Sequence, residues 1–213
     1  MENLELLEKS AIKNLKIALD EKKIAIESKN MAKAELKKAK AREQLSKKGL
    51  ELAKIRKELA EQTTNLIKSK IASKDLFEYS DLGLNIEKKY ALFNENLAHI
   101  QIEIAENHRK IAKVETDISE ANKSLMDEKI HVAKEREKLG KLQLAYVKLV
   151  KAAASEEKKA RAKEKFGSQQ NDLKKSENRI NEKMEIVRKK QNTLSDLKKK
   201  LTLKLSEREK IRP

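Results

Sequence analysis

The chain has 213 residues, of which 40% are charged and 3% aromatic, with four glycines, one proline and no cysteine or tryptophan. An average globular domain has about 25% charged residues. Strands and tight turns need aromatic, β-branched, glycine and proline residues, so the β and α/β classes have little material here. The composition therefore predicts long helices or a coiled coil and argues against a compact enzyme.

Features of secreted or membrane-spanning proteins are missing from the sequence. The first 20 residues include acids from Glu2 to Glu8 and lack the apolar core of a secretory signal peptide. The most apolar stretch, residues 142–154, contains Lys148 and Lys151 and is too short to cross a bilayer. The lack of cysteine fits a reducing compartment. We expect a cytoplasmic protein, with any membrane contact limited to the membrane surface.

Two parallel rows of residues, each with a spacing of seven, mark the first predicted helix. The small row is Ala11, Ala18, Ala25, Ala32, Ala39, Ser46, Ala53 and Ala60. The large row beside it is Ile17, Ile24, Met31, Leu45, Leu52, Leu59 and Leu66. Small side chains let two helix backbones approach closely, and we expect the large ones to seal the seam between them. The pattern predicts a first helix at about residues 1–79.

A second helix follows a predicted turn. Residues 80–85 read SDLGLN, in which four of six residues favour turns, although a helix running straight through Gly83 is the alternative. From Ile86 to Ala160, seam positions recur at alternating steps of four and three, the 3.5-residue repeat of a left-handed coiled coil. We expect a second helix at about residues 86–166, with a mostly apolar seam.

A third helix completes the predicted architecture. Residues 166–172 read FGSQQND, which predicts a second turn at 167–171 and a helix at about 172–212. The fold class is then all-α: an elongated antiparallel coiled coil in which two helices of about 80 residues form a hairpin. The third, of about 40 residues, packs on the base of this hairpin. We expect residues 1–213 to form a single elongated domain.

A turn near residue 82 sets a register in which residue i of the first helix faces residue 164 − i of the second. Lys29 then lies opposite Glu135 and Lys57 opposite Asn107, whereas Glu8 faces Glu156 unfavourably. Buried polar residues cost stability but penalise shifted registers. The predicted register residues are Lys29, Lys57, Asn107, Glu128 and Glu135.

The net charge of +16 predicts an anionic partner. Residues 41–128 hold 15 basic and 16 acidic side chains, so the excess falls on the predicted three-helix base. The folding model gathers a basic collar there, consisting of Lys37, Lys38, Lys40, Arg42, Arg208, Lys210 and Arg212. Lysine outnumbers arginine and aromatics are few, which favours diffuse attraction over base reading. Nonspecific nucleic-acid binding stays open.

Two groups of acids and histidines have the helical spacing of metal ligands. The first is Glu128 with His131 and Glu135, and the second is Glu95 with His99 and Glu103. A di-metal bundle needs a second Glu-x-x-His and further inward acids, which the sequence lacks. We interpret both groups as ion-paired surface or seam residues. We expect no metal, cofactor, catalytic residue or small-molecule substrate.

Three functions remain open for such a chain. The first is a non-enzymatic structural or scaffolding protein that self-assembles, as a homo-oligomer, or docks into a larger protein assembly. In length, helix count and basic charge the chain also resembles the crescent-shaped coiled-coil dimers of the BAR type, which implies an anionic membrane surface as the partner. The third is a stalk or chaperone subunit of a secretion or rotary machine.

Overall fold

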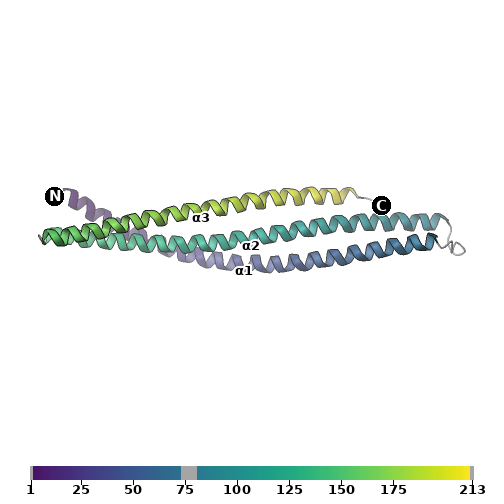
Figure 1. Ribbon diagram of the computed structural model, residues 1–213, viewed down its shortest axis with the longest axis horizontal. Coiled ribbons are helices and arrows are strands. Elements are labelled where there is room, and N and C mark those ends of the chain that lie inside the picture. The colour runs from purple at the N-terminus through teal and green to yellow at the C-terminus, as the bar shows by residue number, and fades with distance from the viewer. Residues whose placement is uncertain (1, 73–80, 212–213) are drawn as a thin grey trace. The chain divides into compact units, whose positions relative to one another are not determined.

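The computed structural model describes residues 2–72 and 81–211, and these residues form three α-helices (Figure 1). The helices are α1 (Glu2–Ala72), α2 (Asp81–Lys151) and α3 (Glu156–Lys210). No strand occurs within these described ranges. The all-α fold class is confirmed, and the predicted turn at 80–85 is partly wrong, because residues 81–85 already belong to α2. The connection from α1 lies in 73–80, outside the described residues.

The chain groups into two compact units, and each helix contributes to both. Unit 1 comprises residues 1–36 and 118–189, and unit 2 comprises residues 37–117 and 190–213. Within each unit, α1 packs against α2 and α3 packs on α2.

The small row of α1 forms its contact with α2, as its spacing predicts. The buried members of this row are Ala11, Ala18 and Ala25 in unit 1, and Ala39 and Ala53 in unit 2. Small side chains permit a close approach of the two backbones. In unit 1 the approach is so close that a Cβ added at Gly140 of α2 would lie 3.1 Å from the backbone oxygen of Ala11.

The large row of α1 does not seal this seam, and that expectation is wrong. Six of its seven members are exposed: Ile24, Met31, Leu45, Leu52, Leu59 and Leu66. Each member precedes a small-row position by one residue, which turns it by about 100° around the helix. Because α2 lies so close to the small row, it leaves the neighbouring row in solvent.

The register between α1 and α2 differs from the predicted one by about one heptad. In unit 1, Lys29 Nζ lies 2.5 Å from Asp127 Oδ1 instead of facing Glu135. In unit 2, Arg42 lies 3.8 Å from Glu115. In both pairs residue i faces about residue 157 − i, so the two helices are antiparallel in each unit.

The turn predicted at 167–171 is wrong, because α3 begins sixteen residues earlier than expected and runs through Gly167. The break instead follows α2 at residues 152–155. Ala153 has φ of 50° and its N–H donates to Val150 O, while Ala154 N–H donates to Leu149 O. These are the two hydrogen bonds of a Schellman cap, a motif that usually has glycine at its left-handed position.

Replacing Ala153 with glycine is expected to stabilise the protein. An L-residue in the left-handed region costs about 1–2 kcal/mol, and the greater freedom of glycine in the unfolded chain offsets part of that gain. We expect Ala153→Gly to raise the free energy of unfolding by about 0.5–1 kcal/mol. Urea denaturation followed by circular dichroism measures this change. A destabilised variant would contradict the left-handed cap.

The contact of α3 with α2 has an apolar core in unit 1. Val132 and Leu139 of α2 pack with Leu173 of α3, with the partly buried Phe166 and Ile180 around them. Phe166 belongs to the stretch that was predicted to lie at a turn. Its burial against α2 shows why a helix persists there, since packing outweighs the low helix propensity of the neighbouring glycine and serine.

Arg136 of α2 links all three helices in unit 1. Its guanidinium lies 2.5 Å from Glu21 of α1 and 2.7 Å from Glu177 of α3. Burial lowers the pKa of Arg136, but the hydrogen bonds with Glu177 and Glu21 outweigh it, so the pKa lies above its ordinary value. The side chain therefore stays charged and orients two neighbours at once.

Candidate functional site

The predicted register residues do not meet one another between α1 and α2. Glu128 pairs with Lys183 of α3 at 3.4 Å, and Glu135 accepts a hydrogen bond from Gln169 of α3. Lys57 lies 3.2 Å from Glu61, one turn along its own helix. Asn107 is half-buried. The acids in the α2 seam thus face α3 rather than the lysines of α1.

The described residues of the predicted basic collar are distributed along α1 and the C-terminal part of α3. Arg42 and Lys198 lie 3.8 and 3.9 Å from the two oxygens of Glu115. Arg208 lines a groove with Leu45 and Arg56, farther along α1 than Arg42. Lys37, Lys38, Lys40 and Lys210 are exposed, and Arg212 lies outside the described residues. The structure thus brings Arg42 near Lys198, a residue that was not predicted to belong to the collar.

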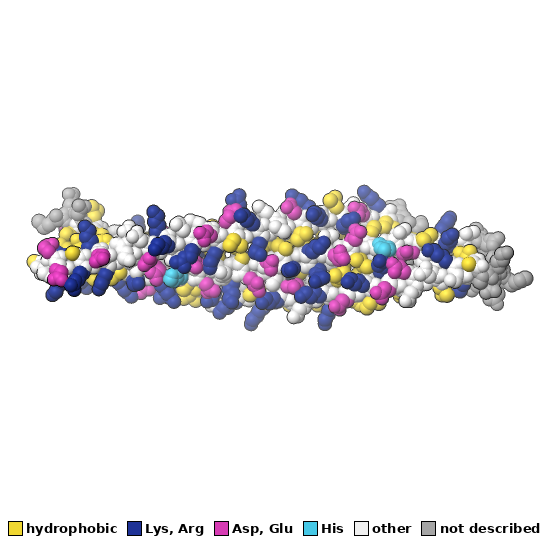
Figure 2. Space-filling view, viewed as in Figure 1, with side chains coloured by type: hydrophobic (Ala, Val, Ile, Leu, Met, Phe, Trp, Pro, Cys, Tyr) yellow, Lys and Arg dark blue, Asp and Glu magenta, His cyan; other side chains and the backbone are white. Residues whose placement is uncertain are grey.

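The excess charge is shared by the two units instead of lying in one of them. By sequence, unit 1 has 26 basic and 19 acidic residues, and unit 2 has 25 and 16, which gives +7 and +9. The expected segregation fails because the C-terminal part of α3 belongs to unit 2, whereas it was expected on the base. In Figure 2 blue lysine and arginine side chains appear beside magenta acids over the visible face.

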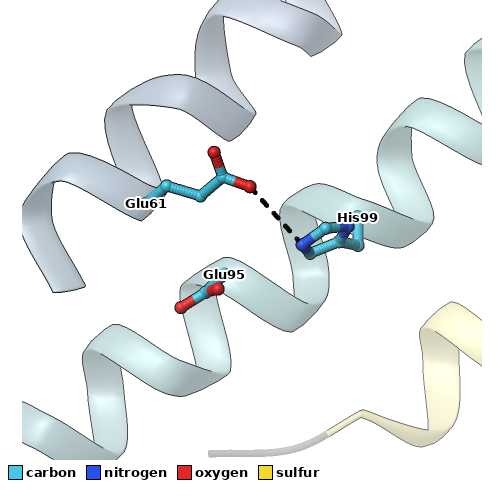
Figure 3. Close-up of side chains that lie close together, drawn as sticks. All are labelled: Glu61, Glu95 and His99. Atoms are coloured by element: carbon cyan, nitrogen blue, oxygen red, sulfur yellow. Dashed lines mark ion pairs between the residues drawn. The ribbon is translucent and has the colours of Figure 1, made fainter. Parts of the chain in front are cut away.

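A group of three potential metal ligands lies in unit 2. Glu61 of α1 points toward His99 of α2, with Glu95 one turn away (Figure 3). Their ligand atoms all lie within 4.8 Å of one another. Glu103, which was considered with His99 from its spacing, instead pairs with Lys204 of α3 at 2.8 Å. Sequence spacing missed Glu61 because it comes from the other helix.

This group is better described as an ion-pair cluster than as a metal centre. Glu61 Oε1 lies 3.7 Å from His99 Nε2 and 3.2 Å from Lys57 Nζ. A lysine ammonium beside a carboxylate competes with a cation for that oxygen. His99 is exposed, and no buried polar partner orients its ring among the contacts described. We therefore assign it no metal.

A stripe of exposed apolar side chains on α1 is the most distinctive surface of unit 2. Its members, which we call the outer stripe, are Leu45, Leu52, Ile55, Leu59 and Leu66. All five are between 57% and 68% exposed. Steps of three, four or seven residues separate successive members, so they share one face of the helix. Leu50 and Ala53, between them in sequence, are buried and turned toward α2.

Two open grooves lie beside the outer stripe. The first has a volume of about 560 Å³ and is lined by Leu45 and Leu52 of α1, Ile104 of α2 and Arg208 of α3. The second, of about 260 Å³, is lined by Leu59 of α1 and Leu97 of α2. Single exposed apolar residues are ordinary on protein surfaces, whereas several on one helix face beside a groove are typical of an interaction site.

The arrangement can bind another helix but offers little for catalysis. A seven-residue repeat of leucines is the pattern of a coiled-coil seam.

Comparison of the chain with protein-family models and with curated proteins gives no significant match. Among the described residues, no helix is both long and apolar enough to cross a membrane.

Proposed function

We propose that the protein is a non-enzymatic structural protein that self-assembles through the outer stripe of α1. In this proposal α1 and α2 form an elongated antiparallel coiled coil, and the outer stripe joins it to a further helix. The observation that carries the proposal is the exposure of five large apolar residues on one face of α1, in a heptad-like spacing.

The energy available from covering the outer stripe is of the same order as the cost of association. Fully burying an exposed Leu or Ile contributes about 1.5–3 kcal/mol, so covering a side chain that is about 60% exposed contributes about 1–2 kcal/mol. A symmetric contact covers ten such side chains, on the order of 10 kcal/mol. Association costs about 4–15 kcal/mol in lost freedom. The gain is thus comparable with the cost.

The first test is the mass of the protein in solution. We expect a dimer or larger oligomer by size-exclusion chromatography with light scattering, and the Leu52→Lys, Leu59→Lys double variant to dissociate because each change places a charge in the seam. Leu203→Lys is the matched control, since Leu203 is 65% exposed on α3 outside the stripe. A monomer at high micromolar concentration, or equal loss with the control, would refute the proposal.

Salt distinguishes this assembly from binding to an anionic partner. Unit 2 carries +9, so two copies repel each other and screening by salt strengthens their association. We expect the dissociation constant of the assembly to fall when ionic strength rises. Attraction to an acidic protein or to anionic vesicles weakens under the same change. Assembly that dissociates at high salt would contradict a contact made by the apolar stripe.

A further inference from the structure

The outer stripe also contains information on how a partner helix lies against it. We propose that its occupant is a second copy of this chain, with the two α1 helices parallel and in register from Leu45 to Leu66. The inference rests on the proposed function and adds to it the orientation and the pairs of residues that meet.

The stripe forms a complete coiled-coil seam when two intervening positions are added. Steps of three and four residues give the seam Leu45, Lys48, Leu52, Ile55, Leu59, Gln62 and Leu66. Buried Leu50 and Ala53 lie outside it, so this seam lies beside the buried α1–α2 contact and is not part of it. In a parallel contact each seam residue faces its own copy, which places Leu, Ile and Leu together at the centre. Leucine lies at the a positions and Ile55 at a d position, an arrangement that also favours the addition of further copies beyond two.

Charges beside the seam favour the parallel orientation. In a parallel coiled coil, the residue that precedes a seam leucine lies near the residue five positions later in the partner helix. Glu51 of each copy therefore lies near Arg56 of the other copy, which gives two such pairs. Both side chains are exposed. In an antiparallel pair with Leu52 opposite Ile55, the same flanks bring Glu51 toward Glu58, a repulsive pair, and Arg56 toward Gly49. Charge complementarity is therefore present in only one orientation.

The pairing between the residue before a seam leucine and the residue five positions later also indicates where the contact ends. Toward the N-terminus the equivalent pair is Lys37 with Arg42, two like charges, and Lys38 occupies the position of a leucine. Lys48 is the one cation inside the seam, and its long chain lets the ammonium reach solvent. Lys48 and Gln62 are the two polar residues of the seam, and such residues lower stability but help to specify register. We expect the contact to cover about three heptads.

Cysteine cross-linking tests the register, because the chain has no cysteine of its own. In the parallel dimer the two copies of residue 52 face each other within the range of a disulfide. Leu52→Cys is expected to form a covalent dimer with oxidised glutathione, while Lys54→Cys, on an exposed position of another face, stays mostly uncross-linked. A dimer that links only when Leu52→Cys is mixed with Ile55→Cys is antiparallel and overturns the inference while leaving the proposed function intact.

A charge exchange tests the flanking pairs by a second route. Arg56→Glu replaces two attractions with two repulsions and is expected to weaken dimerisation by about tenfold or more. Adding Glu51→Arg to that variant is expected to restore wild-type dimerisation. If the double variant dimerises no more strongly than Arg56→Glu alone, the pairing of Glu51 with Arg56 is refuted. A wild-type protein that is monomeric refutes the proposed function as well.

Discussion

Replacing Gly140 with alanine is expected to destabilise the protein, although alanine is the better helix former. The added Cβ would lie 2.8 Å from Leu15 Cγ and 3.1 Å from the backbone oxygen of Ala11. Neither atom is the free end of a side chain, so the two helices must move apart. Overpacking costs about 1–3 kcal/mol, which exceeds the gain in helix propensity of about 1 kcal/mol. We expect a net loss of up to about 2 kcal/mol in the free energy of unfolding, measured by urea denaturation.

Two other glycines are matched controls for this prediction. A Cβ at Gly49 or Gly167 has nothing within 4 Å. Both residues lie inside helices, so Gly49→Ala and Gly167→Ala are each expected to stabilise the protein by about 0.5–1 kcal/mol. The same substitution thus has opposite signs at positions of different packing. A stabilised Gly140→Ala would contradict the close approach, and a destabilised Gly167→Ala would favour a turn there.

The helical class and the α1–α2 contact could be predicted because they depend on local properties of the chain. Composition excludes strands, and the 3.5-residue repeat places Ala18 and Ala53 in the seam, where both are buried. These inferences use side-chain size and period only. They need no knowledge of which helix is the neighbour.

The register could not be predicted, because a heptad repeat looks the same after a shift of seven residues. The predicted alignment placed Glu8 against Glu156, a repulsive pair. The observed shift of about one heptad instead brings Glu8 within 2.5 Å of Lys151. The repulsion between Glu8 and Glu156 is thus the feature of the sequence that argues against the predicted register.

The start of α3 was hidden by glycine and asparagine near residue 167. The break between α2 and α3, at residues 152–155, contains alanines where turn-forming residues are usual, so residue propensities do not predict it. A helix-start signal was nevertheless present, because Ser155 precedes Glu156 and Glu157, and acids favour the first turn of a helix. The cost of Gly167 within α3 is offset by the packing of Phe166 and Leu173 against α2.

The outer stripe was visible in the sequence but was assigned to the wrong contact. Leu52 and Ala53 are adjacent, and either row could face α2 on periodicity alone. The separation of the two backbones decides between them. At Gly140 in unit 1 the backbones of α1 and α2 lie so close together that only small side chains fit between them. A leucine row does not fit in such a contact. Period thus identifies the rows of a helix, while the distance between helices decides which row is left for a partner.

The buried acid Glu128 of the α2 seam gives the second prediction, a large loss of stability when its cationic partners on α3 are removed. Glu128 is only 12% exposed, and its Oε2 lies 3.4 Å from Lys183 Nζ. Its Oε1 is buried, has no hydrogen-bond partner among the described residues, and lies 3.9 Å from Arg179 Nε. A buried ion pair contributes little net stability, but removing one partner leaves a charge away from water.

Replacing both Arg179 and Lys183 with leucine is therefore expected to lower the free energy of unfolding by about 3 kcal/mol. Adding Glu128→Leu should recover most of that loss, because it removes the unpaired charge and adds apolar surface to the contact. Lys141→Leu is the control, since Lys141 is 66% exposed in its pair with Glu137 and surface pairs contribute about 0–1 kcal/mol. If the triple variant is no more stable than the double one, the loss comes from the packing of the removed side chains, and the charge of Glu128 has no part in setting the position of α3.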